Sequence, residues 1–236
     1  AYFSLNYSDE RGTYTNDNNR IYSLRAKIDQ KINRTLTAGI NLQLAYTHSN
    51  TRKGVYTKAM TSLPLGTAYN EDGGINPEPI PGSTEVSVLT DEQGGVYKNQ
   101  TKNVKVYVNG YMEWKPFKGF SFRSIAGATL TDKRNGQFKS MDSYEGLSGS
   151  LGNTNYSYVT NGRSYNYKWE NIATYNFQIA KDHDFIVTGV TSWNHNQNEN
   201  FDLGGRGIPY DSYLFYNLKS ATTGKEVVSK YEMSKG

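Results

Sequence analysis

Apolar and polar residues alternate along two neighbouring segments near the start of the chain. Between residues 22 and 32 most even positions are apolar and the odd ones polar, and the same alternation returns between residues 36 and 46. Successive side chains of a β-strand point to opposite faces, so a period of two predicts strands with one apolar and one polar face. The short link from Asn33 to Thr35 predicts that the two strands form a hairpin.

A second hairpin is predicted further along the chain. Residues 103–114 alternate Val and Met with polar residues, and residues 120–130 form the return strand after a turn from Lys115 to Gly119. Ile125 breaks the alternation of the return strand. Small residues occupy much of the apolar face of this return strand, so its side chains there have little volume.

A third hairpin pairs residues 165–180 with residues 184–196 around a turn from Lys181 to Asp184. The register of its return strand stays open, because two sets of apolar residues compete for one face. These sets are Phe185, Val187, Gly189 and Trp193 on one side and Ile186 and Val190 on the other. Residues 1–9 alternate as well and bring the number of predicted strands to seven.

The lengths of these strands and of their connections indicate a membrane wall. Several strands have 10 to 14 residues, whereas strands of soluble proteins usually have about 5–6. A tilted membrane crossing needs roughly 9–11 residues. Three turns are tight, while the links at residues 50–102 and 132–164 are long. Short turns at one end and long loops at the other are typical of outer-membrane barrels, so we predict an all-β, antiparallel transmembrane β-barrel segment with long extracellular loops.

Side-chain chemistry on the two faces agrees with this interpretation. The polar face carries charges that suit a wet lumen, at Arg25, Lys27, Lys105 and Arg123. Aromatic residues near the predicted strand ends are expected to form the two interfacial girdles; they are Tyr22, Tyr46, Trp114, Phe120, Tyr167 and Trp169.

Composition argues against several other classes of protein and site. Only 36% of residues are hydrophobic, but 14% are aromatic, and 20 of the 236 residues are Tyr. Disordered chains are poor in aromatic residues, so the chain is expected to fold. The net charge of +4 is spread along the sequence without a basic run, and no nucleic-acid partner is predicted. The absence of cysteine excludes disulfides and thiolate metal sites. No apolar stretch is long enough for a membrane helix, and no signal peptide opens the chain.

Residues that could carry chemistry do not form a catalytic or metal-binding pattern. His48, His183 and His195 lack a second ligand at metal-binding spacing. The acidic run with Glu71 and Asp72, which Glu78 follows, lacks the ligand alternation of an EF-hand, and we expect a solvated loop there. Gly204–Gly207 is predicted to be a loop hinge, because no strand-to-helix phosphate motif surrounds it. No GxSxG motif occurs. No enzyme activity and no cofactor are predicted.

Ligand recognition is expected from the long loops and the polar strand face. Aromatic rings there can lie against sugar rings, and Asn, Asp and Arg can hydrogen-bond hydroxyl groups. The alternative is that a loop Tyr packs within its own loop. The candidate ligand-binding residues are Tyr69, Tyr97, Tyr156, Tyr158, Tyr210 and Tyr213.

The order of several segments resembles the SusC-like (SusC/RagA) family of TonB-dependent outer-membrane transporters of Bacteroidetes. The resemblance is carried by AYFSLNYSDERG with the NNRIYSLRAKIDQKINRTLTAGINLQLAYTHS hairpin, MTSLPLGTAYNEDGG, NGYMEWKPFKGFSFRSIAG and GRGIPYDSYLFYNLKSAT. It covers nearly the whole chain. It implies about seven strands of a 22-stranded barrel in the bacterial outer membrane.

The same resemblance implies import of a glycan or peptide, a SusD-like surface lipoprotein as partner and energy supplied through TonB. The plug domain, the TonB box and the closing C-terminal strand are not found in this sequence, so residues 1–236 are expected to be part of one barrel domain. The final stretch, TGKEVVSKYEMSKG, is expected to be another outer loop. Two alternatives stay open. One is a soluble, surface-exposed β-structured adhesin or binding protein, and the other is a siderophore or cobalamin receptor of the same superfamily.

Overall fold

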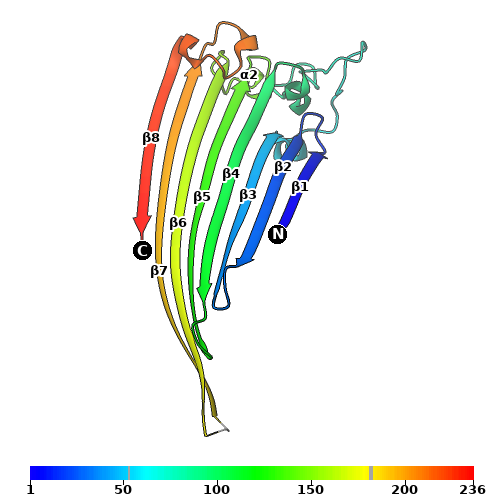
Figure 1. Cartoon of the computed structure of the whole chain (residues 1–236). Helices are drawn as coiled ribbons and strands as arrows, with labels where there is room; N and C mark the ends of the chain where they lie inside the picture. The colour runs from blue at the N-terminus through cyan, green and yellow to red at the C-terminus, as the bar shows by residue number, and fades with distance from the viewer. Residues whose placement is uncertain (53, 181–182) are drawn as a thin grey trace.

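The computed structural model describes residues 1–52, 54–180 and 183–236. Within these residues, eight antiparallel strands form one sheet in which each strand pairs with the next along the chain (Figure 1). The strands are β1 (Tyr2–Arg11), β2 (Asn18–Lys31), β3 (Leu36–Asn50), β4 (Tyr97–Trp114), β5 (Phe120–Lys139), β6 (Tyr156–Ile179), β7 (His183–Arg206) and β8 (Thr223–Lys235). The connections contain two short helices, α1 (Val55–Thr61) and α2 (Tyr144–Leu147), and three 3-10 turns, η1 (Val88–Glu92), η2 (Asp211–Tyr213) and η3 (Leu218–Ser220). The all-β antiparallel prediction is confirmed.

The final stretch of the chain is a strand, contrary to the prediction of an outer loop. β8 pairs with β7 from Lys235 opposite His195 to Thr223 opposite Arg206. Its alternation is weak in the sequence because Val227 and Val228 are both apolar and fall on opposite faces. Pairing with β7, which already has a strongly polar and a less polar face, fixes its register where its own side chains do not.

Most apolar residues of the strands lie on one side of the sheet, which we call the apolar face; the other side is the polar face. Leu24 of β2 lies opposite Leu5 of β1 and Leu44 of β3, and the same row continues to Val106 of β4. Leu5 is 70% exposed and Ile28 is 52% exposed. A soluble protein rarely exposes a continuous apolar surface of this kind, but a barrel wall presents one to lipid.

Pairing with β6 fixes the register of β7. Phe185 lies opposite Phe177, Val187 opposite Tyr175, and Trp193 opposite Trp169. The first pair stacks with ring centroids 5.4 Å apart. This set therefore occupies the apolar face, since β6 has a clear apolar side, and Ile186 and Val190 fall on the polar face opposite Asn176 and Ile172.

Connections differ between the two ends of the sheet, as predicted (Figure 1). At the turn end, the Asn33 side chain accepts hydrogen bonds from the backbone N–H of Thr35 at 2.8 Å and of Leu36 at 2.9 Å, which closes the β2–β3 turn. Gly119 has φ +88°, a conformation that favours glycine, and it closes the β4–β5 turn. Lys181 and Asp182 of the third predicted turn lie outside the described residues. The opposite end, the loop end, carries residues 12–17, 51–96, 140–155 and 207–222.

Several strands run further toward the loop end than predicted. β4 begins at Tyr97, β5 continues to Lys139, and β6 begins at Tyr156. These extensions are mostly polar, with Phe138 and Val159 as isolated apolar residues. The apolar alternation is therefore lost, but the backbone ladder still satisfies their N–H and C=O groups. Tyr167 and Trp169 consequently lie in the middle of the 24-residue strand β6 and not near its end, as the girdle prediction required.

The loop-hinge prediction for Gly204–Gly207 is wrong for most of that segment. Gly204, Gly205 and Arg206 continue β7, and the pairing with β8 shifts register between Gly204 and Arg206. Gly207 alone lies beyond the strand, with φ +66°. The glycines allow a bulge and close approach of the chain, which is the usual meaning of glycine within a strand.

Aromatic rows mark both ends of the apolar face. Tyr7, Tyr22 and Tyr46 lie opposite one another near the loop end, with successive ring centroids 5.0 and 6.2 Å apart. At the turn end, Phe117 stacks on Phe120 at 5.3 Å and Tyr175 stacks on Phe177 at the same distance. Girdles at the two membrane interfaces take this form.

The β7–β8 connection, residues 207–222, folds back over the apolar face at the loop end, and we call it the strap. Its Phe215 forms a small buried cluster with Phe138 of β5 and Val159 of β6. The Ser157 hydroxyl donates to the Leu214 carbonyl at 2.7 Å. Gly136 provides the space, because a Cβ atom at this position would overlap the Phe215 ring.

Replacement of Gly136 by leucine is expected to expel Phe215 and loosen the strap, because overpacking a filled site typically costs about 1–3 kcal/mol. Limited proteolysis of the full-length protein should show faster cleavage within residues 207–222. Gly189→Leu is the matched control, since Gly189 is also on the apolar face but has open space around its Cβ position. Equal cleavage rates in the two variants would contradict the packing role of Gly136.

Candidate ligand-binding site

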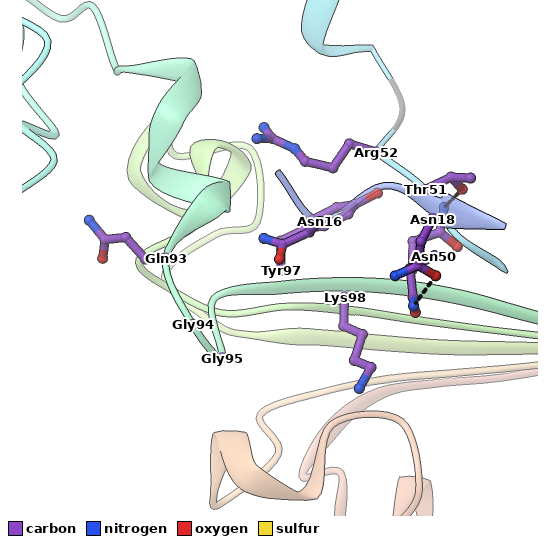
Figure 2. A pocket seen from close by; sticks show the side chains of 11 residues that line it. Asn16, Asn18, Asn50, Thr51, Arg52, Gln93, Gly94, Gly95, Tyr97 and Lys98 are labelled. Carbon is purple, nitrogen blue, oxygen red and sulfur yellow. Dashed lines mark hydrogen bonds between the residues drawn. The ribbon is translucent and has the colours of Figure 1, made fainter. Parts of the chain in front are cut away.

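A cavity of about 250 Å³ opens at the loop end, between the β1–β2 connection and the start of β4 (Figure 2). Its lining is mostly amide and hydroxyl groups, together with one aromatic ring and two cations. The Asn50 amide donates to the Asn18 side-chain oxygen at 3.0 Å, and the Asn99 amide donates to the Thr51 hydroxyl at 3.4 Å. The remaining lining residues are Asn16, Arg52, Gln93, Gly94, Gly95, Tyr97 and Lys98.

The Arg52 side chain holds this end of the wall together. It is only 4% exposed and forms ion pairs with Asp91, at 3.2 Å, and with Glu92. Its guanidinium also donates to the Val88 carbonyl at 2.8 Å. The backbone N–H of Arg52 donates to the Asp17 carboxylate at 2.7 Å, so Arg52 links the β1–β2 connection to η1 of the 51–96 loop.

Asp91 extends the network to a third loop. Its second oxygen accepts from the backbone N–H of Tyr144, at the start of α2, at 2.7 Å. The Lys58 ammonium of α1 lies 3.7 Å from the centroid of the Tyr144 ring and 4.0 Å from Glu145. Burial lowers the pKa of Lys58, and the nearby Glu145 carboxylate acts in the opposite direction. Three connections therefore form a single rim.

The polar face below the rim carries a column of asparagines. Asn194, Asn196, Asn198 and Asn200 occupy every second position of β7, on the side opposite Trp193. Asn166 of β6 lies opposite Asn196 and donates hydrogen bonds to Asn196 and, at 3.1 Å, to Asn194. Amide side chains both donate and accept hydrogen bonds, so the column can bind hydroxyl or peptide groups. The sequence analysis does not include this column among the candidate sites, although asparagine at every second position is visible in the sequence.

A second polar cluster lies nearer the turn end. The Tyr111 hydroxyl donates to the Asp29 carboxylate at 2.7 Å, and the Arg123 guanidinium lies 4.4 Å from the Tyr111 ring centroid. Gly39 lies directly between Asp29 and Tyr111, and a Cβ atom there would overlap both side chains. Charged and aromatic groups thus line the polar face well below the rim.

Three of the six candidate tyrosines lie on β-strands and not in loops. Tyr97 begins β4, lines the cavity and has the Arg52 guanidinium 5.8 Å from its ring centroid. Tyr156 and Tyr158 of β6 stack with centroids 6.1 Å apart on the polar face. Arg206 lies 5.3 Å from the Tyr156 centroid. These side chains border the polar wall.

The other three candidate tyrosines lie elsewhere. Tyr210 and Tyr213 are part of the strap and contact each other edge to face at 5.4 Å. Tyr69 is in the 51–96 loop, where it bridges to Ile75, and it is 59% exposed. The structure therefore does not gather the six tyrosines into one site.

Residues considered for metal binding are dispersed. The part of the chain that the structure describes contains no group of three His, Cys, Asp or Glu side chains that could hold a metal ion. His48 and His195 lie within β3 and β7, and His183 begins β7. Glu71, Asp72 and Glu78 are exposed, and the Asp72 side chain accepts a hydrogen bond from the Gly74 N–H at 2.9 Å.

Among the described residues, none of the helices is both long and apolar enough to cross a bilayer.

Comparison with known proteins gives a consistent set of similarities. No protein-family model matches the sequence. The TonB-dependent receptor P26 of Formosa agariphila is 24% identical over 229 residues, which is 97% of this chain and 23% of the relative. A structure of the RagAB peptide importer in the closed-closed state aligns with a TM-score of 0.78 at 18% identity, covering 99% of this chain and 26% of that one. The open-open state gives 0.74 at 20% identity, with the same coverage. The chain thus spans about a quarter of the length of these proteins.

Proposed function

Because this chain is a barrel segment of a SusC-like TonB-dependent transporter, we propose that the full-length protein imports an oligosaccharide or a peptide across the bacterial outer membrane. In this proposal the segment forms part of the barrel wall, with its apolar face toward lipid and its polar face toward the lumen. The observation that carries the proposal is the continuous two-faced sheet, which places the asparagine column opposite the apolar residues of the same strands.

The amide and aromatic groups of the polar face support a hydrogen-bonding substrate. Asn166 and the asparagine column offer amide groups, and Tyr156 and Tyr158 offer aromatic surface. Sugar hydroxyls and peptide groups can both use such contacts. We further propose a SusD-like surface lipoprotein as partner and TonB as the source of energy. The plug and TonB box would lie outside this segment, and residues 1–236 would belong to a single barrel domain.

Two other functions fit less well. A soluble surface-exposed β-adhesin would bury the apolar sides of its strands, whereas Leu5 and Ile28 are mostly exposed here. A siderophore or cobalamin receptor would share the barrel, and the substrate experiment below separates it from a glycan or peptide importer. No group on the described polar wall forms a catalytic arrangement, and the similar proteins are named as receptors and importers.

The proposed import is tested by deleting the gene and measuring uptake of labelled oligosaccharides, peptides, ferric siderophores and cobalamin. We expect loss of one of the first two and recovery with the full-length protein. Normal uptake of both, with loss of siderophore or cobalamin uptake, would overturn the substrate proposal. Fractionation without detergent as a soluble protein would overturn the membrane placement.

The asparagine column gives a sharper prediction. The combined replacement of Asn194, Asn196 and Asn198 by alanine should reduce uptake by about tenfold or more, since each lost hydrogen bond contributes roughly 0.5–1.5 kcal/mol. Gln197→Ala is the control, because Gln197 lies on the other face of the same strand. Uptake should be normalised to the amount of folded protein in the outer membrane. Unchanged uptake would show that substrate passes without contacting this column.

A further inference from the structure

Strand register brings four basic residues, far apart in the sequence, into one row on the apolar face. Arg20 of β2 lies opposite His48 of β3, His48 opposite Lys102 of β4, and Lys102 opposite Arg134 of β5. The sequence has no basic run, so the row exists only in the folded sheet. Directly opposed residues are about 4.5–5.5 Å apart, which gives the row a length of roughly 15 Å.

Among the described residues, carboxylates of the protein neutralise only one cation of this row. Arg20 pairs with Asp9 at 3.2 Å, and the nearby Asp132 is already paired with Arg163 at 2.8 Å. Among the described residues, Lys102 and Arg134 have no acidic side chain within ion-pair distance; Arg134 lies 5.7 Å from the Tyr216 ring centroid. Like charges on directly opposed residues destabilise a sheet, so an external anion would stabilise this one.

A further polar atom in the row has no partner. The Nε2 atom of His48 is buried and has no hydrogen-bond partner among the described residues. Lys98, also on this face of β4, lies near the strap (Figure 2) and adds a fourth cation to Arg20, Lys102 and Arg134. Arginine and lysine side chains are the usual partners of phosphate oxygens.

The position of the row identifies the anion. It lies two residue pairs beyond the Tyr7, Tyr22 and Tyr46 row, at the next position on the same face toward the loop end. Aromatic rows of barrels sit at the level of lipid headgroups. We propose that Arg20, His48, Lys102 and Arg134 bind the phosphate groups of a phosphorylated lipid in the outer leaflet. The length of the row allows two phosphates of one headgroup to be bound together.

The test uses the full-length transporter in detergent and measures bound lipid by native mass spectrometry. Diphosphoryl lipid A, phosphatidylcholine and inorganic phosphate serve as the three probes. We expect retention of lipid A in preference to phosphatidylcholine. Arg20→Gln, Lys102→Gln and Arg134→Gln should each weaken the affinity by about fivefold, and a first triple variant should combine these losses. Added salt should weaken the binding as well.

A matched triple variant controls for total charge. Arg25→Gln, Lys105→Gln and Lys133→Gln remove three charges from the same strands, β2, β4 and β5, but on the polar face. Lipid retention should be unchanged in this variant. Lys102→Gln alone provides a milder variant if the first triple fails to fold, which gel mobility with and without heating reveals.

Three results would overturn the proposal. They are equal lipid retention by both triple variants and the parent, equal loss in both variants, and inorganic phosphate displacing lipid A at equal concentration, which would indicate a site for the free ion. The proposal rests on the membrane placement proposed above but not on the transported substrate. The measured quantity is bound lipid, so a negative result would contradict lipid binding but not the import proposal. Normal uptake of substrate would not count as support for lipid binding.

Discussion

Replacement of Arg52 by alanine is expected to lower the free energy of opening of the loop-end rim by about 3–5 kcal/mol, because two carboxylates would be left nearly buried without their cation. Asp91 and Glu92 are each only 12% exposed, so water cannot fully replace the guanidinium. Hydrogen exchange of the full-length protein should show residues 12–17, 51–62, 88–95 and 140–152 losing protection together, since Arg52 and Asp91 link these segments.

Two variants control this experiment. Arg52→Lys keeps the charge but loses the forked geometry, and should fall between the parent and Arg52→Ala. Arg34→Ala removes an exposed arginine at the turn end and should change stability by no more than about 0.5 kcal/mol. Loss of protection confined to the residues next to position 52 would show that the rim is not one cooperative unit.

An arginine in place of Val108 is expected to cost about 2–4 kcal/mol of folding free energy, because a cation at the bilayer midplane is poorly solvated. Val108 lies on the apolar face opposite Leu42 and Ala128, about halfway along the apolar part of β4. Urea titration of the full-length protein in phospholipid vesicles measures the free energy of unfolding for the variant and the parent.

The neighbouring position supplies the matched control. Asn109 lies on the polar face opposite Asn41 and Gly127, so Asn109→Arg would place the same charge toward a wet lumen. We expect a change of about 1 kcal/mol or less there. Equal costs at the two positions, or a larger cost at Asn109, would refute the assignment of the two faces.

Most of the sheet could be predicted from the sequence because alternation is a local signal. Leu24, Leu44 and Val106 alternate with polar neighbours, and this periodicity fixes both the strand and its face. The signal fails where strands are mostly polar, as in the extensions from Tyr97 and Tyr156, and where apolar residues fall on both faces, as at Val227 and Val228. In those segments pairing with a neighbouring strand decides the structure.

The site was less predictable because it depends on contacts between distant residues. The sequence predicts loops at Tyr97, Tyr156 and Tyr158, which lie on strands, while Tyr210 and Tyr213 belong to the strap. The rim network joins Asp17, Arg52, Asp91 and Tyr144 across three connections, and no short-range pattern encodes such contacts. By contrast, the asparagine column follows period two and was available to sequence reasoning.

The sheet has two open edges within the described residues, since β1 pairs only with β2 and β8 only with β7. Each edge presents a row of backbone N–H and C=O groups, and such rows template pairing with other chains. A polypeptide limited to these strands would therefore be prone to self-association in solution. Biophysical measurements on this wall should be made in the complete barrel, where neighbouring strands can occupy both edges.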